Sequence, residues 1–156
     1  MNRHSAQEFL KLFQVYRYEN QLKFYQERQI EFTKAQTQAI SISIGLIFFA
    51  AAAGALASVS ESWLKVACLL VAAIFPVLST AIAGYSVLYA FEQQAKLYQD
   101  TINNLLLARS LEPDIQPELS DTDFIDQLDK YVHEIEKIFL AEQGQWGQLA
   151  KTMKPS

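Results

Sequence analysis

Two long stretches without a charged residue constrain this sequence more than any other feature. One run of 26 uncharged, mostly apolar residues follows Lys34, and a second run of 26 follows Lys65. Because a helix rises about 1.5 Å per residue, roughly 20 apolar residues cross the ~30 Å hydrocarbon core of a bilayer. The sequence therefore predicts two membrane-spanning helices, at residues 40–59 and 64–89.

A soluble protein with a buried helical hairpin is the main alternative for these runs. Helices in a soluble core usually show a polar face within two turns, and neither run has one. A signal peptide is excluded because the first apolar run starts near residue 40, after a polar segment. Both spans are therefore expected to stay in the membrane.

The short link between the spans and the placement of basic residues predict the topology. The link, residues 60–63, is so short that the two spans must be antiparallel neighbours in a hairpin. Its Trp63 fits the aromatic belt at a membrane interface. Residues 1–39 carry six lysines and arginines, residues 92–156 carry six, and the link region carries only Lys65. Since positive residues stay on the cytoplasmic side, both termini are expected in the cytoplasm.

Small and weakly polar residues are expected to define the contact faces of the spans. In the first span, Ala50, Gly54 and Ser58 recur every four residues, a ridge that lets another helix approach closely. In the second span, Pro76 removes a backbone donor and is expected to kink the helix. A weakly polar line follows on the second span, formed by Ser79, Ala83 and Ser86.

Long amphipathic helices are predicted on both sides of the hairpin. Residues 5–39 lack Gly and Pro and are expected to form one helix that runs directly into the first span. The second span is expected to continue as a helix to about Arg109. After a break with two prolines, a last helix is predicted over residues 121–150, starting at a capping-box-like Ser120. The predicted fold is thus a single all-α membrane domain, a hairpin flanked by cytoplasmic helices.

Apolar side chains follow helical spacing in these flanking helices. The first helix carries two stripes, one of Phe9, Leu12, Phe13 and Tyr16, the other of Val15, Tyr18, Leu22, Tyr25, Gln29, Phe32, Gln36 and Ala39. The last helix carries a heptad seam of Ile125, Leu128, Val132, Ile135, Phe139, Trp146 and Leu149, widened by Phe124, Tyr131 and Ile138. Helices with so many aromatic and aliphatic residues are expected to pack against one another.

Glu142 interrupts the seam of the last helix, four residues before Trp146 on the same face. A carboxylate in an apolar seam needs a partner, because an unpaired buried charge is costly. Arg17 and Arg28 of the first helix are the expected partners. Fraying of the helix at its two C-terminal glycines is the alternative.

Residue types that carry catalysis, cofactor binding or metal binding do not gather in the sequence. His4 and His133 are expected to be solvated, and Cys68, the only cysteine, is expected to be buried among apolar residues. No Gly-rich phosphate loop or nucleophile elbow occurs, and the net charge of −4 argues against bulk nucleic-acid binding. Four aspartates, at 121, 123, 126 and 129, suit the positive end of a helix dipole, with a weak divalent site as the alternative. We expect no enzyme, no cofactor and no metal.

The layout of the chain resembles the SLATT domains, two-helix membrane effectors of bacterial nucleotide-signalling conflict systems. The matching residues are Phe24, Tyr25, Gln26, Glu27, Arg28 and Phe32 before the first span, Tyr98 after the second, and Phe124, Val132, Glu136, Ile138, Glu142 and Trp146 at the end. The resemblance implies a pore-forming effector that stays silent until infection and then damages the cell's own inner membrane. It also implies a neighbouring nucleotidyltransferase or nucleotide-sensing protein that supplies the signal.

A homo-oligomeric, ion-conducting pore in membrane lipid is the leading functional hypothesis. Glu61 and Glu92 then place rings of negative charge at the two mouths, which favours cations, and the weakly polar line of the second span lines the path. The cytoplasmic helices form the gate, biased by a cyclic nucleotide, an oligonucleotide or a protein partner. The candidates for contact with such a nucleotide are Arg17, Lys23 and Arg28 for phosphate, and Tyr25 and Phe32 for base stacking. The alternative is a membrane-anchored scaffold that recruits a cytoplasmic partner without conducting.

Overall fold

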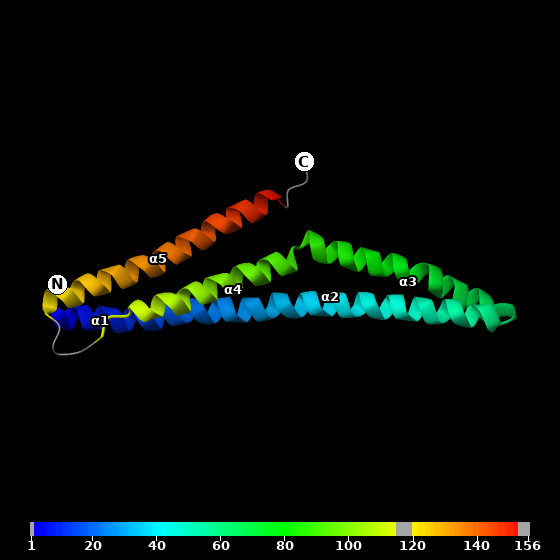
Figure 1. Ribbon diagram of the computed structural model, residues 1–156, viewed down its shortest axis with the longest axis horizontal. Helices are drawn as coiled ribbons and strands as arrows, with labels where there is room; N and C mark the ends of the chain where they lie inside the picture. The colour runs from blue at the N-terminus through cyan, green and yellow to red at the C-terminus, as the bar shows by residue number, and fades with distance from the viewer. Residues whose placement is uncertain (1, 115–119, 153–156) are drawn as a thin grey trace. The chain divides into compact units, whose positions relative to one another are not determined.

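The computed structural model describes residues 2–114 and 120–152, with side chains up to Gly147, and every regular element within these ranges is a helix (Figure 1). The helices are α1 (Arg3–Phe13), α2 (Asn20–Val59), α3 (Ser62–Leu88), α4 (Phe91–Ala108) and α5 (Asp121–Thr152). They divide into two compact units, the first made of Met1–Ile30 and Gln94–Ser156, the second of Glu31–Gln93. Both α2 and α4 contribute residues to each unit.

A π-helical segment, Gln14–Glu19, separates α1 from α2, where one uninterrupted α-helix was expected. A π-turn holds one residue more than an α-turn. The eight steps from Leu10 to Tyr18 therefore make about two turns, whereas in an α-helix the two side chains would lie some 80° out of line. Both side chains are buried, at 1% and 2% exposure, so the wider turn keeps them on one face.

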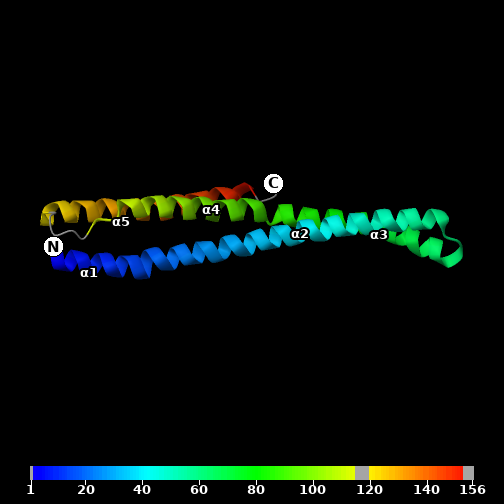
Figure 2. The same ribbon diagram turned by 60° about the horizontal axis from the view of Figure 1, so that its bottom comes forward.

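The first unit has a continuous apolar core, in which α1 packs against α5 (Figure 2). Its most deeply buried large side chains are Leu10, Tyr18, Leu105, Phe124, Tyr131 and Ile135. The Tyr18 hydroxyl donates to the carbonyl oxygen of Leu105 at 3.1 Å, which connects the beginning of the chain to α4. The expectation that the amphipathic faces pack together is confirmed for this unit. The stripe predicted at the start of the chain is not its buried face, because Phe9, Leu12 and Tyr16 are 44–70% exposed while Ala6 and Leu10 are buried.

The buried face of α5 is centred differently from the predicted heptad seam. Phe124 and Tyr131, expected only to widen the seam, are fully buried, whereas Ile125 and Val132 are half-buried. The predicted capping residue is confirmed, because the Ser120 hydroxyl accepts from the backbone N–H of Asp123 at 3.2 Å and donates to its carboxylate at 2.6 Å. The side chain of Leu149, and residues 115–119 of the proline-containing break, lie outside the described residues.

In the second unit, α2 and α3 contact one another through small and polar side chains. The Ser43 hydroxyl donates to the carbonyl oxygen of Ser79 at 3.4 Å, and the Ser79 hydroxyl donates back to that of Ser43 at 3.1 Å. Further along, Ala72 lies 4.0 Å from where a Cβ on Gly54 would be, so the two backbones come close there. Two residues, 60 and 61, link the helices, and α3 begins at Ser62.

The buried ridge on α2 is not the one predicted from four-residue spacing. Ala50, Ala53 and Ala57 are buried, Gly54 is half-buried, and Ser58 is exposed with its hydroxyl bonded to the carbonyl of Ala55. Steps of four residues drift about 40° per step around a helix, whereas alternating steps of three and four stay on one face. The true ridge follows the second pattern.

α3 and α4 are separate helices, although one continuous helix was expected. The chain turns at Tyr89 and Ala90, where Ala90 adopts a left-handed φ of 50° and is buried. Aromatic rings lie around this turn. The ring centres of Tyr85 and Tyr89 are 4.3 Å apart, and those of Phe91 and Phe32 of α2 are 6.3 Å apart. This aromatic packing gives the turn a fixed environment that helical periodicity alone does not reveal.

Two helices in the described chain are long and apolar enough to cross a membrane, as the charge-free runs predicted. In the second unit these helices leave large apolar side chains exposed, with Phe48 and Val77 at 68% and 67%. A monomeric soluble protein seldom exposes so extensive an apolar surface. The exposed surface argues against the soluble alternative, in which these helices would form a core.

Candidate functional site

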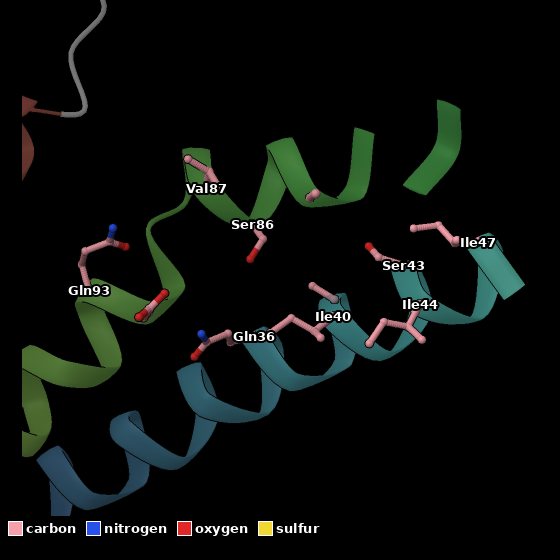
Figure 3. A pocket seen from close by; sticks show the side chains of 11 residues that line it. Gln36, Ile40, Ser43, Ile44, Ile47, Ser86, Val87 and Gln93 are labelled. Atoms are coloured by element: carbon pink, nitrogen blue, oxygen red, sulfur yellow. The ribbon is translucent and has the colours of Figure 1, made fainter. Parts of the chain in front are cut away.

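A groove of about 320 Å³ lies between α2 and α3 in the second unit (Figure 3). The residues that line it are Gln36, Ala39, Ile40, Ser43, Ile44, Ile47, Ala83, Ser86, Val87, Glu92 and Gln93. This volume is in the range of small-molecule sites, about 300–1,000 Å³. The groove is therefore large enough for a ligand rather than a single water molecule.

The lining changes in polarity along the groove. Gln36 on α2, with Glu92 and Gln93 at the start of α4, gives one end amide and carboxylate groups, while Ile44 and Ile47 on α2 make the other end apolar (Figure 3). From Gln36 to Ile47 the distance along the helix is about 16 Å at 1.5 Å per residue. Over that length the lining is polar at one end and apolar at the other, which matches the two ends of an amphiphilic molecule.

Several polar groups of the groove have no partner among the described residues. The Ser86 hydroxyl points into the space between α3 and α2, and makes no hydrogen bond (Figure 3). Neither Glu92 nor the two glutamines of the lining has a hydrogen bond or an ion pair in the described chain. Ser43 differs, since it is bonded to Ser79. Ser86 lies within the predicted span, where an unpaired polar group is costly, so its hydroxyl calls for water or a ligand.

The predicted lining residues fall into three places. Ser79 is 4% exposed and its hydroxyl is used in the contact with α2, so it does not line the groove. Ala83, Ser86 and Glu92 do line it. Glu61 is exposed at the start of α3, outside the groove. Pro76 lies inside α3 and is exposed.

A second polar site lies in the first unit, at Glu142 of α5. Its carboxylate accepts a hydrogen bond from the Tyr25 hydroxyl at 3.0 Å and another from the indole N–H of Trp146. The ring of Tyr98 lies 5.2 Å from that of Trp146 and 6.0 Å from that of Tyr25, so α4 completes the cluster. Glu142 therefore joins α5 to α2 within an aromatic environment.

The expectation that Arg17 or Arg28 pairs with Glu142 is wrong. Arg17 instead makes a two-pronged ion pair with Glu136, one turn and a half earlier on α5, with both N–O distances at 2.9 Å. Its guanidinium also lies 4.7 Å from the centre of the Phe139 ring. Arg28 lies over the ring of Phe24 at 5.5 Å. Neutral donors therefore hold Glu142, and the arginine holds a more exposed carboxylate.

These contacts shift several pKa values. Burial, followed by the charge of Glu142 and the hydrogen bond to it, raises the pKa of Tyr25 strongly, so its hydroxyl keeps its proton and stays a donor. The hydrogen bond from Arg17 lowers the pKa of Glu136, and the same bond raises the pKa of Arg17. Burial raises the pKa of Tyr131 to about 12. The Tyr131 hydroxyl is buried without a hydrogen-bond partner in the described chain.

The remaining ligand-contact candidates lie apart from one another. Lys23 is exposed, with its ammonium 3.9 Å from the carboxylate of Glu27. Tyr25 is 3% exposed and committed to Glu142, and Phe32 is half-buried against Phe91 in the second unit. The structure therefore brings Arg17 and Tyr25 near the same stretch of α5, while Phe32 belongs to the surroundings of the α3–α4 turn.

A metal site has no support in the described residues, where no group of three potential ligands gathers. Of the aspartates at the start of α5, Asp121 lies 3.6 Å from Arg3 and Asp123 is bonded to Ser120. Sequence reasoning missed Gln36 and Gln93 as groove residues. The spacing of Gln36, Ile40, Ser43 and Ile47 on one helical face is the signal that was present.

The SMODS and SLOG-associating 2TM effector domain 1, the first of the SLATT families, matches residues 14–146 of the chain. No curated protein and no solved structure matches it. The matched region includes both apolar helices and the cluster around Glu142. SLATT domains are effector domains, and they are not a known enzyme family. The chain therefore belongs to the SLATT family, as its layout predicted, and is a membrane effector of the kind associated with nucleotide signalling in anti-phage systems.

Proposed function

We propose that this effector forms an ion-conducting pore in the bacterial inner membrane, built from several copies of the hairpin of α2 and α3. This proposal is supported mainly by the groove, in which Ser86, inside an apolar span, and Glu92, just beyond its end, have no partner among the described residues. One pair of helices cannot enclose a channel, so a homo-oligomer is required. When copies assemble with their grooves inward, these polar groups face water and their desolvation is avoided.

The charge of the lining favours cations. Glu92 is the charged residue of the groove, and neither lysine nor arginine is among its lining residues. Repeated around an oligomer, Glu92 forms a ring of carboxylates at the cytoplasmic mouth, and Glu61 at the link forms a second ring at the opposite end. This placement follows the distribution of lysines and arginines, which puts both termini in the cytoplasm.

The first unit is proposed to act as the gate. Arg17 already holds a carboxylate in two-pronged geometry, which also suits a phosphate group. A nucleotide or oligonucleotide phosphate that competes with Glu136 for Arg17 would loosen α5 from the beginning of the chain, and Lys23 and Arg28 lie further along the same helix. Tyr25 is assigned a structural role, because Glu142 occupies its hydroxyl. A ligand then shifts the balance between closed and open packings.

Thiol accessibility in conducting vesicles tests the pore. In a Cys68→Ala background, Ala83→Cys places a thiol in the groove, and Ala81→Cys, on the same helix outside the groove, is the matched control. A charged, water-soluble thiol reagent reacts with the thiolate, which forms only in contact with water. Modification is expected to reduce ion flux through the first variant and leave the second unchanged. Equal modification of both, or no flux from the purified protein under any trigger, overturns the pore.

A tethered scaffold is the second candidate, favoured by a surface of the first unit. Phe9, Leu12 and Tyr16 are exposed along α1 and its π-helical extension, and Phe9 borders a groove with Ile125 and Val132 of α5. Exposed apolar rows of this kind mark protein contacts. Replacing Leu12 and Tyr16 with serine removes that row. If a partner is recruited through it, the variant loses the partner while vesicle flux, if any, persists.

A further inference from the structure

The groove between α2 and α3 has features that a path for hydrated ions alone does not require. It is about 320 Å³ in volume, polar at one end, and apolar at the other. Since the apolar residues Ile40, Ile44 and Ile47 belong to the predicted span and Gln36 precedes it, the polar end lies at the membrane interface and the apolar end in the hydrocarbon. This is the orientation of a phospholipid in the same leaflet.

The polar end offers acceptors for a cationic head group. Glu92 supplies a carboxylate, Gln36 and Gln93 supply amide oxygens, and Ser86 supplies a hydroxyl, none of them engaged by the described residues. A primary ammonium carries three N–H donors and can use several of these acceptors at once. An anionic head group is disfavoured, because none of the lining residues is basic.

The lining also discriminates between two kinds of ammonium. A quaternary ammonium, as in choline lipids, donates no hydrogen bond and is usually recognised by aromatic rings. None of the eleven residues that line the groove is aromatic. The head group that fits this surface is therefore a primary ammonium.

We infer that the groove binds one phospholipid with a primary ammonium head group, such as an ethanolamine lipid, in the closed state. The ammonium lies at Glu92 with Gln36 and Gln93 beside it, and one acyl chain follows Ile40 and Ile44. The inference rests on the proposed function in one respect, that the same groove lines the open path. A lipid in that position and a passing ion exclude one another, so the lipid is a regulator of the resting pore.

Lipid binding by the purified full chain tests the inference without any measurement of flux. The probes are four lipids with identical acyl chains, whose head groups carry ethanolamine, its mono- and dimethyl forms, and choline. All four keep the positive charge and lose N–H donors in steps. Native mass spectrometry is expected to show retention falling along the series, by roughly tenfold between its ends, as the loss of a charge-assisted hydrogen bond implies.

Matched variants assign the preference to the groove. Glu92→Gln, which leaves the neutral acceptors in place, is expected to weaken the gradient, and Glu61→Gln, which changes an exposed glutamate outside the groove, is expected to keep it. Ile44→Trp fills the apolar end and lowers retention of every lipid, whereas Ile42→Trp, exposed on the same helix outside the groove, does not. A flat series in the unmodified protein, as when a second copy fills the groove, or a gradient that Glu92→Gln leaves unchanged, overturns the inference.

The outcomes for the lipid and for the pore are separable. A protein that prefers ethanolamine lipid but never conducts refutes the pore and leaves the lipid site standing. A protein that conducts while retaining all four lipids equally refutes the lipid site alone.

Discussion

The hydroxyl of Tyr25 donates to the carboxylate of Glu142 at 3.0 Å, a contact between α2 and α5 across 117 positions of the chain. The same carboxylate accepts from Trp146, which lies four residues further along α5. Glu142 is thus held by two neutral donors within a half-buried aromatic cluster. An unpaired carboxylate there would be costly, so the cluster fixes the pairing of the two helices as well as their distance.

Tyr25→Phe is expected to destabilise the first unit by about 1.5–3 kcal/mol, the usual worth of a hydrogen bond to a charged group. The ring is kept, so the loss reports the hydroxyl rather than the packing. Unfolding by urea of the full chain in detergent measures the change. Tyr16→Phe is the control. Because Tyr16 is 70% exposed, this substitution should change the free energy of unfolding by no more than about 0.5 kcal/mol. Equal effects of the two changes would contradict the assignment.

The pair of Arg17 and Glu136 predicts a dependence on pH. Because the folded state lowers the pKa of Glu136, its contribution is present above the unfolded pKa, about 4.3, and is lost as the pH falls through the lower pKa of the folded state. The side chains of Arg17 and Glu136 are 44% and 39% exposed, so screening keeps the contribution under about 1 kcal/mol. The difference in unfolding free energy between the wild type and Glu136→Gln is therefore expected to be full at pH 7 and to shrink progressively as the pH is lowered below about 4.3. Glu27→Gln, which removes a longer and more exposed pair, should give a smaller difference.

Tyr131 and Tyr18 form a matched pair of buried tyrosines with opposite expectations. The Tyr131 hydroxyl is buried without a hydrogen-bond partner in the described chain, so Tyr131→Phe is expected to be neutral or to stabilise by about 1 kcal/mol. The Tyr18 hydroxyl bonds the carbonyl of Leu105, so Tyr18→Phe is expected to cost about 0.5–1.5 kcal/mol. Thermal unfolding of both variants measures these changes. A loss of stability in Tyr131→Phe as large as in Tyr18→Phe would show that the Tyr131 hydroxyl has a hydrogen-bond partner.

The reciprocal bonds of Ser43 and Ser79 are expected to couple α2 to α3. Hydrogen bonds between helices in a membrane are worth about 0.6 kcal/mol on average and at most about 1.7. Each hydroxyl bonds the backbone carbonyl of the other residue, so Ser43→Ala and Ser79→Ala each remove one bond, and their losses, measured by unfolding in detergent, are expected to lie in this range and to add. Ser58→Ala is the control, because its hydroxyl bonds within its own helix, and it should cost less than either; a loss as large as theirs would contradict the prediction.

The helices could be predicted because long apolar, charge-free segments alternate with long charged ones. The sequence could not predict which side of each helix is buried. The shift from Ile125 and Val132 to Phe124 and Tyr131 on α5 is one residue, which periodicity cannot resolve without knowing the neighbouring helix. The π-helical segment Gln14–Glu19 was equally invisible, since it contains neither glycine nor proline. Its extra residue moves the buried face of α1 from the predicted stripe to Ala6 and Leu10.

The partner of Glu142 shows the same limit in the candidate sites. Charge alone suggested arginine, and the neutral donors Tyr25 and Trp146 became evident only from the packing of three helices. Gln36 and Gln93 are ordinary polar residues at the edges of the apolar runs. They meet in one groove because α2 contacts α3 at Ser43 and Ser79 and the chain turns at Ala90 before Gln93.

The shortness of the two-residue link at Ser60 and Glu61 bears on the side of the membrane from which this effector can be triggered. In the proposed orientation, that link and the first turn of α3 are what the region between the spans presents to the cell's exterior. A protease or an antibody added from outside has little of this region to act on, whereas the helices on either side of the spans are open to the cytoplasm. In that orientation the trigger acts from the cytoplasm, so the protein responds to a signal made in its own cell rather than to one outside it.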